Sequence, residues 1–312
     1  MKFCFIINPK AGKERPNRLI RRLEALLERD SLSYEFRVTT KPGHAIALAE
    51  KAAASGLFDR IVAIGGDGTI NEVVNGMVRV CMQDKDGPGN HPALGLIPAG
   101  MGNDTARGLG IPRGLKNAYT VLIQGSTRYI DIGEVNGRFF INGVGVGYDG
   151  AVMSEMYDIR RKGKILSRWI YFKCLMHQLR RFTPPLLCLE IDNKFLPPRR
   201  YLLFLIANGT CIGGIFKLTP KASLDDGLLD LLLVEAVPRH TFLLNIPRAI
   251  MGKHLSLRQV SYYMSGKVTI KSDNPVPCHI DGESYYNNQF SIRLLPKALR
   301  IVGPGALPAG RY

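Results

Sequence analysis

Residues 60–80 read RIVAIGGDGTINEVVNGMVRV, and this stretch sets the fold class of the first part of the chain. Its opening apolar run, Arg60–Ile64, is typical of a buried strand, and Ile70–Val80 has the apolar spacing of a helix. The turn between them is Gly65-Gly66-Asp67-Gly68-Thr69. Glycines at such a turn let backbone N–H groups approach a phosphate, and the N-terminus of the following helix favours negative charge.

This turn predicts a phosphate site that includes a second charge. Asp67 would repel a phosphate, so a magnesium ion or a fixed basic partner is implied beside it. The alternative is a glycine-rich turn in which Asp67 caps the helix, and the spacing alone leaves both interpretations open. The GxxxxGK[ST] P-loop and the HRD and DFG elements of protein kinases are absent from the sequence.

The same alternation of strand and helix continues on both sides of this stretch. Short apolar runs at Phe3–Ile7, Tyr34–Thr39 and Leu94–Ile97 predict strands. Helical spacing at Leu19–Leu27 and the Ala-rich segment Ala45–Ser55 predict the helices between them. Alternating strands and helices predict a doubly wound parallel sheet, so the first part of the fold is α/β.

Two further glycine-bearing loops follow predicted strands. The first is NPKAGK at residues 8–13, where Lys13 is placed to reach a phosphate or, in the simpler interpretation, is a solvated surface lysine. The second is PAGMGND at residues 98–104, where Asn103 and Asp104 could instead cap a helix. Because the carboxyl ends of parallel strands share one edge of a sheet, we expect these loops to lie beside GGDGT.

The pattern changes near residue 126, where short β-type runs separated by turn residues replace the alternation. Such runs occur at residues 139–142, 186–191, 201–207, 228–234, 267–271 and 290–294. They predict an antiparallel β-sandwich as the C-terminal domain. We therefore predict an α/β domain at residues 1–125 and a β-sandwich domain at 126–295, with a more helical insertion at 155–181.

Composition excludes several classes of protein. The chain has 312 residues, of which 46% are hydrophobic and 22% charged, with a mean hydropathy of −0.01. These values are typical of a folded chain with two modest domains and exclude disorder, collagen and coiled coil. The first residues do not have the pattern of a signal peptide, and no apolar run approaches a membrane span. The scattered cysteines, without zinc-finger spacing, predict reduced core thiols in a cytoplasmic protein.

The charge is unevenly distributed along the chain. The formal net charge is +16, which indicates an anionic partner such as nucleic acid, a phosphorylated small molecule or an acidic membrane. Residues 1–125 hold 17 Lys and Arg against 12 Asp and Glu, whereas residues 126–312 hold 25 against 14. Most of the basic excess therefore belongs to the second domain.

The most basic segment is residues 160–181, which contain eight Lys and Arg and no acidic residue. Apolar residues interleave with the charges, so we predict a basic amphipathic helix that carries Trp169, the single tryptophan. Docking on anionic lipid headgroups and packing of the apolar face on the second domain remain open, and both can hold together. The expected membrane-contact residues are Arg160, Arg161, Lys162, Lys164, Arg168 and Trp169.

Two acidic motifs lie in the second domain. In HIDGE at residues 279–283, Asp281 and Glu283 would point the same way on an extended backbone. Such a pair can serve as a general base with its supporting acid or as metal ligands, and the alternative is an exposed Asp-Gly turn. Asp225-Asp226-Gly227 has the composition of a type I turn.

Taken together, these motifs resemble the bacterial soluble lipid kinases of the diacylglycerol kinase catalytic family, which share a core with sphingosine kinases. GGDGT alone is weak because it also occurs in NAD kinases and phosphofructokinases, but the order of the other motifs makes the resemblance specific. The motifs that carry it are NPKAGK (8–13), Thr39 before KPGHA, GGDGTINEVVNG (65–76), PAGMGND (98–104), FINGVGVGYDG (140–150), NGTCIGG (208–214), PKASLDDGLLDL (220–231) and HIDGE (279–283).

The resemblance implies an ATP site between the two domains, with Thr39 near the adenosine. The nucleotide-binding residues that it implies are Asn8, Pro9, Lys10, Ala11, Gly12, Lys13, Thr39, Gly65, Gly66, Asp67, Gly68, Thr69, Asn71, Glu72, Gly100, Met101 and Asn103. It also implies that residues 296–312 return to the first domain. Relatives usually carry Ser or Thr in place of Met101, and a thioether cannot donate a hydrogen bond to phosphate or substrate.

The resemblance further implies the catalytic and metal residues. Asp281 and Glu283 would activate the lipid hydroxyl, and which of them takes the proton stays open. Asp226 would hold a structural Mg²⁺ with the carbonyls of Ser223 and Leu228, and this ion would link Asp67 through water to the nucleotide.

From these observations we expect an ATP-dependent lipid kinase that acts at the inner face of the cytoplasmic membrane as a peripheral protein. Diacylglycerol is the default acceptor, and phosphatidylglycerol, a polyprenol, a sphingoid base and ceramide remain open. The alternatives are an NAD kinase, or a nucleic-acid-binding protein with a degenerate kinase core, although no nucleic-acid motif is present. We do not expect nucleic acid as a partner, and a homodimer remains open.

Overall fold

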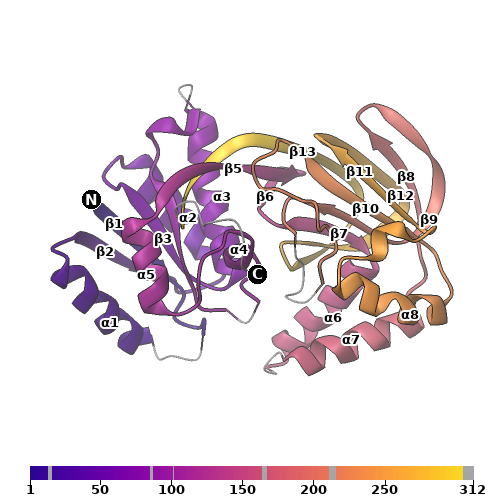
Figure 1. Ribbon diagram of the computed structural model, residues 1–312, viewed down its shortest axis with the longest axis horizontal. Helices are drawn as coiled ribbons and strands as arrows, with labels where there is room; N and C mark the ends of the chain where they lie inside the picture. Colours follow the sequence, from indigo (N-terminus) through magenta and orange to yellow (C-terminus); the bar gives the residue numbers. More distant parts are fainter. Residues whose placement is uncertain (13–15, 85–86, 101, 164–166, 211–215, 305–312) are drawn as a thin grey trace. The chain divides into compact units, whose positions relative to one another are not determined.

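The computed structural model describes residues 1–12, 16–84, 87–100, 102–163, 167–210 and 216–304, and it forms two compact units (Figure 1). The first unit is Met1–Ile132 with the segment that returns after Pro296, and the second unit is Gly133–Leu295. The change of unit therefore lies after Ile132 rather than at 125/126, because β5 (Ser126–Val135) begins in one unit and ends in the other.

The first unit is built on a parallel sheet with the strand order β2-β1-β3-β4-β13. Its strands are β1 (Lys2–Ile7), β2 (Ser33–Val38), β3 (Arg60–Gly65), β4 (Ala93–Pro98) and the end of β13 (Glu283–Gly303). The chain steps outward from β1 to β2 and then back past β1 to β3. With right-handed crossovers, this reversal puts the first helix on one face and the next two on the other. The predicted doubly wound α/β fold is confirmed.

The first unit contains five α-helices in its described residues, and four of them pack in two pairs. The helices are α1 (Pro16–Arg29), α2 (His44–Ala54), α3 (Asp67–Gln83), α4 (Asp104–Gly108) and α5 (Leu115–Gln124). The pairs are α1 with α5 and α2 with α3. The hydroxyl of Tyr119 on α5 donates to Leu26 O and Asp30 Oδ2 at the end of α1 (3.0 and 2.8 Å). On the other face, a Cβ at Gly76 of α3 would collide with Ile46 O and lie 2.7 Å from Ala49 Cβ, so α2 and α3 are in backbone contact.

The second unit is antiparallel, with the main strand order β11-β10-β9-β7-β12-β13. β8 pairs with β9 and β12, and β5 pairs with β6. The strands are β6 (Arg138–Phe140), β7 (Gly143–Gly147), β8 (Leu186–Ile191), β9 (Lys194–Ala207), β10 (Leu229–Glu235), β11 (Val260–Ser265) and β12 (Lys267–Ile280). This agrees with the predicted antiparallel β-rich domain.

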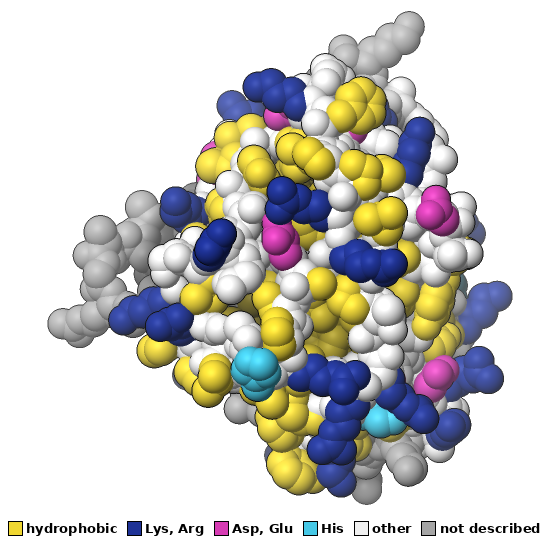
Figure 2. Space-filling view, turned by 90° about the vertical axis from the view of Figure 1, so that its right-hand side faces the viewer, with side chains coloured by type: hydrophobic (Ala, Val, Ile, Leu, Met, Phe, Trp, Pro, Cys, Tyr) yellow, Lys and Arg dark blue, Asp and Glu magenta, His cyan; other side chains and the backbone are white. Residues whose placement is uncertain are grey.

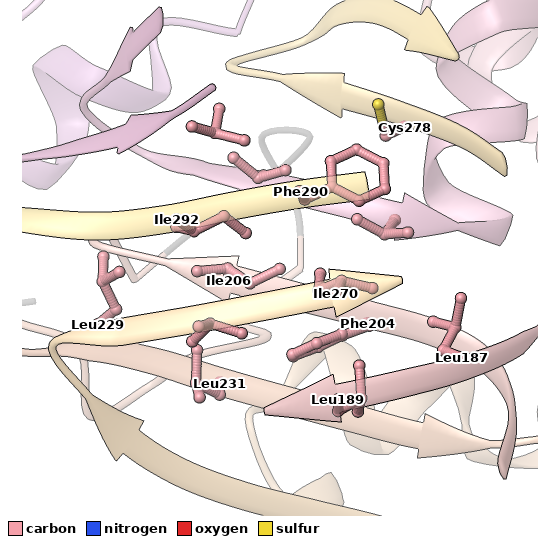
Figure 3. Packing of buried hydrophobic residues seen from close by; sticks show 14 of the residues in the cluster. Leu187, Leu189, Phe204, Ile206, Leu229, Leu231, Ile270, Cys278, Phe290 and Ile292 are labelled. Atoms are coloured by element: carbon pink, nitrogen blue, oxygen red, sulfur yellow. The ribbon is translucent and has the colours of Figure 1, made fainter. Parts of the chain in front are cut away.

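Alternating side chains of these strands form the core of the second unit. Leu187 and Leu189 on β8, Phe204 and Ile206 on β9, and Ile270 on β12 point into the same buried space (Figure 3). Each of these side chains is buried, as the period of two along a half-buried strand requires. The core thus holds β12, the strand that leads into the acidic motif at 279–283, and β7, which pairs with it.

Helices cover part of the second unit, and here one prediction is wrong. The segment 160–181 is not one helix: α6 (Tyr148–Arg161) ends before Gly163, and α7 (Arg168–Arg181) begins after Ser167, whose hydroxyl caps it through Ile170 N (3.3 Å). Gly163 has a φ of 78°, which ends a helix without strain. A third helix, α8 (Arg239–Ile250), packs with them through a shared apolar cluster that includes Tyr148, Leu175 and Phe242.

The cysteines only partly match their prediction. Cys4, Cys81, Cys174 and Cys278 are free and buried, and burial raises the pKa of the Cys278 thiol to about 12. Cys188 is exposed because it lies on an outward-facing position of β8, so it is not a core thiol. Cys211 lies outside the described residues.

Candidate active site

The three predicted phosphate loops are joined at the carboxyl edge of the parallel sheet. Asn8 follows β1, and its Nδ2 donates to Thr69 Oγ1 in the loop after β3 (2.9 Å). Asn8 N donates to Ile64 O (3.0 Å), and Ala99 N after β4 donates to Gly65 O (2.8 Å). The side chain of Asn8 also accepts from Lys10 N (3.0 Å). Sheet hydrogen bonding thus continues past the strand ends and fixes the loops to one another.

Glycine is required where the loops touch. A Cβ at Gly100 would lie 2.6 Å from Gly66 Cα, and one at Gly66 would lie 3.2 Å from Gly100 Cα. At Gly12, with a φ of 83°, a Cβ would lie 3.0 Å from Ala99 O. Gly68 differs from these positions, because a Cβ there would meet nothing within 4 Å. Packing among the described residues therefore does not explain the glycine at 68.

Side chains of the third loop complete this arrangement. Asn103 is buried in the left-handed region (φ 53°), accepts from Gly100 N (2.8 Å) and donates to Gly100 O (2.9 Å). Asp67, at the start of α3, accepts from Thr105 N (3.1 Å). Asp67 therefore joins the loops after β3 and β4. Lys13 and Met101 lie outside the described residues.

The structure gives Glu72 and Thr39 supporting contacts within the first unit. Glu72 on α3 accepts from Gly43 N (2.9 Å) and Ala45 N (3.1 Å) at the beginning of α2. These bonds satisfy N–H groups that have no partner inside the helix. Thr39 is buried, and its N donates to Ile7 O (2.9 Å). The neighbouring Asn71 is buried on α3, where its side chain accepts from Asn75 Nδ2 (3.1 Å).

In the second unit, Asp281 sits in a tight hairpin turn. Ile280 on β12 pairs with Glu283 on β13, which leaves Asp281 (φ 45°) and Gly282 (φ 85°) as the two-residue loop. Positive φ at both positions is the type I′ turn that Asp-Gly favours. The Asp-Gly turn considered from the sequence is present, and the acidic motif lies on it.

Backbone donors hold the Asp281 carboxylate. Oδ2 accepts from Ile141 N (2.8 Å), and Oδ1 accepts from Asn142 N and Gly143 N (2.9 Å each). Its own N donates to Gly143 O (3.0 Å). A carboxylate that accepts from several N–H groups is fixed in position.

Glu283 is held by side chains instead. Tyr285 donates to Glu283 Oε2 (2.7 Å), and Arg138 donates to the Tyr285 hydroxyl and lies over its ring at 4.3 Å. Burial and the bond to Glu283 raise the pKa of Tyr285, so this hydroxyl keeps its proton as a donor.

A buried His–Asp pair lies next to this turn, and sequence reasoning missed it. His279 Nε2 is 2.7 Å from Asp149 Oδ2, and both side chains are buried. Burial by itself lowers the pKa of His279, but the Asp149 carboxylate, with Asp281, raises it above its ordinary value. The glycine-rich run GVGVG before Asp149 was the available signal, since repeated glycines in a strand indicate close approach of other groups.

The loop at 223–228 contains oxygen donors. Asp226 is exposed and accepts from Leu228 N (3.1 Å), and Ser223 Oγ donates to Asp225 Oδ1 (2.6 Å). One carboxylate and the Ser223 and Leu228 carbonyls form an oxygen-only set that suits Mg²⁺ with water ligands. Among the described residues, no three or more His, Cys, Asp or Glu side chains are grouped so that they could hold a metal ion. A metal site in this loop would therefore need the backbone carbonyls and water as ligands.

The described members of the predicted membrane-contact set lie at the end of α6 and on the first turn of α7. Arg160, Arg161 and Lys162 are exposed at the end of α6. Trp169 is 64% exposed on the first turn of α7 and stacks on Phe172. Lys164 lies outside the described residues, as does the side chain of Arg168.

Comparison with known families gives two matches that together span most of the chain. Residues 2–135 match the diacylglycerol kinase catalytic domain. Residues 142–303 match the YegS C-terminal NAD kinase beta sandwich-like domain.

Relatives of similar length show the same kinship. The diacylglycerol kinase of Bacillus subtilis strain 168 is 36% identical over 282 residues, which cover 89% of this chain and 88% of that protein. The diacylglycerol kinase of Staphylococcus epidermidis strain RP62A is 33% identical over 281 residues, which cover 89% of this chain and 84% of that protein.

Solved structures share the fold. A putative diacylglycerol kinase from Bacillus anthracis strain Sterne superposes with a TM-score of 0.80 at 23% identity over 98% of each chain. An NAD kinase from Archaeoglobus fulgidus in complex with ATP has a TM-score of 0.52 at 15% identity over 97% of this chain and 93% of that chain.

Proposed function

The chain belongs to the diacylglycerol kinase catalytic-domain family of lipid kinases, and from this premise we propose that it transfers the γ-phosphate of ATP to a hydroxyl of a membrane lipid. We propose diacylglycerol as the acceptor and phosphatidic acid as the product. The observation that carries the ATP assignment is Gly68, the second residue of α3, where an added Cβ would meet no atom of the described residues within 4 Å. A ligand in that space explains the glycine where packing does not.

The first unit supplies the phosphate cradle. The N–H groups of Gly66 to Thr69 start α3, where the helix dipole favours the phosphate charge. Contacts between Gly66 and Gly100 keep the loops after β3 and β4 closely packed, so their N–H groups need not reorganise when ATP binds. Lys10, which follows β1, brings positive charge to the same edge.

Magnesium fits this assignment in two places. Asp67 would meet a nucleotide-bound Mg²⁺, and Asp226 with the Ser223 and Leu228 carbonyls would hold a structural one. When bound, Mg²⁺ neutralises the charge that develops on the phosphate oxygens.

The transfer itself needs an oriented hydroxyl. The lipid oxygen attacks the γ-phosphorus, a new P–O bond forms, and the bond to the oxygen of the β-phosphate breaks to leave ADP. The hydroxyl proton passes to one carboxylate of the acidic pair, Asp281 or Glu283. Three backbone N–H groups fix the Asp281 carboxylate, and such fixed geometry suits it for orienting the hydroxyl.

The lipid acceptor requires access to a membrane, and we propose that α6, α7 and α8 of the second unit supply it. Exposed apolar side chains and basic side chains share these helices. The apolar ones are Trp169, Phe172, Leu243, Leu244, Ile250 and Met251. The basic ones are Arg160, Arg161, Lys162, Lys173, Arg180, Arg181, Arg239 and Arg248. We call these residues the helical surface.

The helical surface is complementary in charge and polarity to an anionic bilayer surface. Leu175 and Leu179 of α7 pack inward, so the apolar side of this helix is buried while Trp169 and Phe172 remain outside. Arg239 of α8 donates to Arg180 O of α7 (2.6 Å), which joins the two helices. Figure 2 shows one face of the molecule on which Lys and Arg lie among hydrophobic side chains and acidic ones are sparse. Basic and aromatic residues together favour the headgroup region.

No helix among the described residues is long and apolar enough to cross a membrane. We propose a peripheral protein at the inner face of the cytoplasmic membrane, held by the helical surface.

The test is transfer of labelled phosphate from ATP to a panel of lipids in mixed micelles. The panel holds diacylglycerol, phosphatidylglycerol, a polyprenol, a sphingoid base and ceramide, with NAD as a water-soluble acceptor. Asp281→Asn is the blank, because it keeps the side-chain size but loses the second carboxylate oxygen. We expect Mg²⁺-dependent labelling of diacylglycerol that Asp281→Asn lowers by at least about 100-fold.

Labelling of NAD rather than a lipid would replace the lipid assignment with NAD kinase. Full activity of a folded Asp281→Asn variant would remove the acid pair from the mechanism. The Asp281 carboxylate also ties the turn to residues 141–143, so the variant's thermal unfolding is measured beside its activity.

A further inference from the structure

The proposed reaction leaves the buried pair of His279 and Asp149 in the second unit without a role. His279 is the penultimate residue of β12, and Asp149 lies in the first turn of α6, 130 residues away in sequence. Their 2.7 Å contact is buried, with 2% of His279 and 8% of Asp149 exposed. A buried charged group is retained only where partners compensate its desolvation, so this pair has a specific structural requirement.

The surrounding backbone is built to admit the pair. A Cβ at Gly145 of β7 would collide with His279 Nε2 and lie 2.6 Å from Asp149 Oδ2. A Cβ at Gly150 of α6 would lie 2.5 Å from Cys278 N on β12. Gly145 therefore brings the backbone of β7 against the His279–Asp149 pair, and Gly150 brings the backbone of α6 against β12. A side chain at either position would push these elements apart.

The pair connects directly to the turn that carries Asp281. His279 Nδ1 accepts from Gly282 N (3.3 Å), while Nε2 faces Asp149. A neutral imidazole protonated on Nε2 satisfies both contacts at once. Asp149 orients the ring from α6, and the ring in turn bonds to the loop. On the opposite side, the backbone of residues 141–143 holds the Asp281 carboxylate.

The charge arrangement favours the same orientation. Asp149 lies in the first turn of α6, where the helix dipole favours a negative charge. The titratable groups that act on His279 are Asp149 from α6 and Asp281 from the turn. The contact with Asp149 Oδ2 selects the Nε2–H tautomer and leaves Nδ1 as the acceptor for Gly282 N.

We propose that His279 and Asp149 are positioning residues that hold the Asp281–Gly282 turn in the geometry needed to orient the acceptor hydroxyl. This inference rests on the proposed kinase function. It predicts that the pair acts through Asp281 without touching ATP or lipid, in the way that outer hydrogen-bond partners orient a ligand or base.

The test compares His279→Gln, Asp149→Asn and the double variant with the intact protein. We expect kcat to fall about 10- to 100-fold in each single variant, with KM for ATP unchanged within about twofold. The double variant should lose no more than the worse single variant, because both substitutions break one unit. His254→Gln is the matched control: His254 is another buried histidine of the second unit, and its Nε2 faces Leu218 O (2.9 Å).

Hydrogen exchange gives a readout that does not depend on activity. We expect the amides of Asp281 and Gly282 to exchange faster in Asp149→Asn, while those of β10 keep the rate of the intact protein. If Asp149→Asn does not fold, His279→Gln, which keeps a side-chain amide donor toward Asp149, takes its place in both measurements.

Unchanged kcat in a folded variant would overturn the inference, as would a loss of kcat that only follows the unfolded fraction. If the intact protein labels no acceptor, the proposed function fails by itself. Exchange then still decides the positioning role: unchanged rates at residues 281 and 282 in Asp149→Asn overturn it, and faster rates there support it.

Discussion

The glycines of the phosphate loops are required for two different reasons, contacts within the chain and space for a ligand. Gly65, Gly66 and Gly100 are required by contacts inside the chain, whereas a Cβ at Gly68 would meet nothing within 4 Å in the part of the chain that the structure describes. The sequence pattern treats these glycines alike, and only the structure distinguishes them.

We predict that Gly68→Ala weakens ATP binding at least about tenfold while leaving the fold intact. Alanine is favoured over glycine inside a helix by about 0.5–1 kcal/mol, so the free energy of unfolding should stay equal or rise. Urea denaturation and calorimetric titration with ATP measure the two effects. Gly108→Ala is the control, since Gly108 is also helical and unobstructed but lies at the end of α4. Equal ATP affinity in both variants would contradict the cradle.

His254 predicts a pH dependence of stability. Burial lowers its pKa in the folded chain below the ordinary value of 6.5. The unfolded chain therefore binds a proton below about pH 6.5 that the folded chain does not, and stability falls as the pH falls through this range. The loss is at most about 1.4 kcal/mol per pH unit.

The intact protein should lose free energy of unfolding between pH 7.5 and pH 5.5. We predict that the His254→Gln variant loses less over the same range, and urea denaturation at the two pH values measures both losses. The difference between the two slopes isolates His254 from other groups. His279, whose pKa is raised, contributes with the opposite sign, because it gains stability on protonation. Parallel slopes for the variant and the intact chain would contradict this prediction.

At the scale of elements, the contact between α2 and α3 depends on a glycine of the GGDGTINEVVNG motif. Gly76 lies in the same stretch as Gly68, but a Cβ there would collide with Ile46 O. We predict that Gly76→Ala lowers the free energy of unfolding by about 1–3 kcal/mol through overpacking, with Gly68→Ala as the comparison. Thermal unfolding measures it. ATP affinity of the folded fraction should not change, and a selective loss of ATP binding would count against a purely structural Gly76.

Most elements of the first unit could be predicted from the sequence, because strand and helix periods differ clearly there. The elements of the second unit are harder to predict from the sequence. β7 reads GVGVG, and glycine has a low strand propensity, so its pairing with β9 and β12 is visible only in the fold. α8 contains Pro247, which weakens a helical pattern. β11 is a half-exposed strand at the end of the sheet, without the alternation that marks a buried one.

The candidate site shows the same division. Loops after consecutive parallel strands meet by topology, so their proximity could be predicted from spacing. The His279–Asp149 contact could not, because 130 residues separate its partners and each has an ordinary local context. Glu72 is a second example. Its motif predicts a contact with the nucleotide, and in the structure the Glu72 carboxylate accepts from N–H groups at the N-terminus of α2.

At the scale of the whole molecule, the charge excess leads to a test of membrane docking. We predict that Arg160→Glu/Arg161→Glu/Lys162→Glu weakens binding to anionic vesicles by about two orders of magnitude at low salt. Each Lys or Arg near such a surface contributes about 1 kcal/mol. Co-sedimentation with phosphatidylglycerol vesicles at rising salt measures it.

The matched control reverses three exposed basic residues of the first unit, Lys51, Arg113 and Lys116, which changes the net charge equally. Equal weakening in both triple variants would indicate a general charge effect in place of a defined surface. Binding that ignores lipid charge and salt would contradict docking by the helical surface.

The return of β13 to the parallel sheet has a consequence for how the chain is made. Ile301 pairs with Leu94 at the outer side of β4, so the fifth strand of the first unit is synthesised after the whole of the second. Until the ribosome has released that last strand, β4 presents an unpaired edge to other nascent chains. Fragments cut at the boundary between the units would keep that edge permanently. The two halves of this protein are thus interdependent during biogenesis, and the second must be translated before the first can be finished.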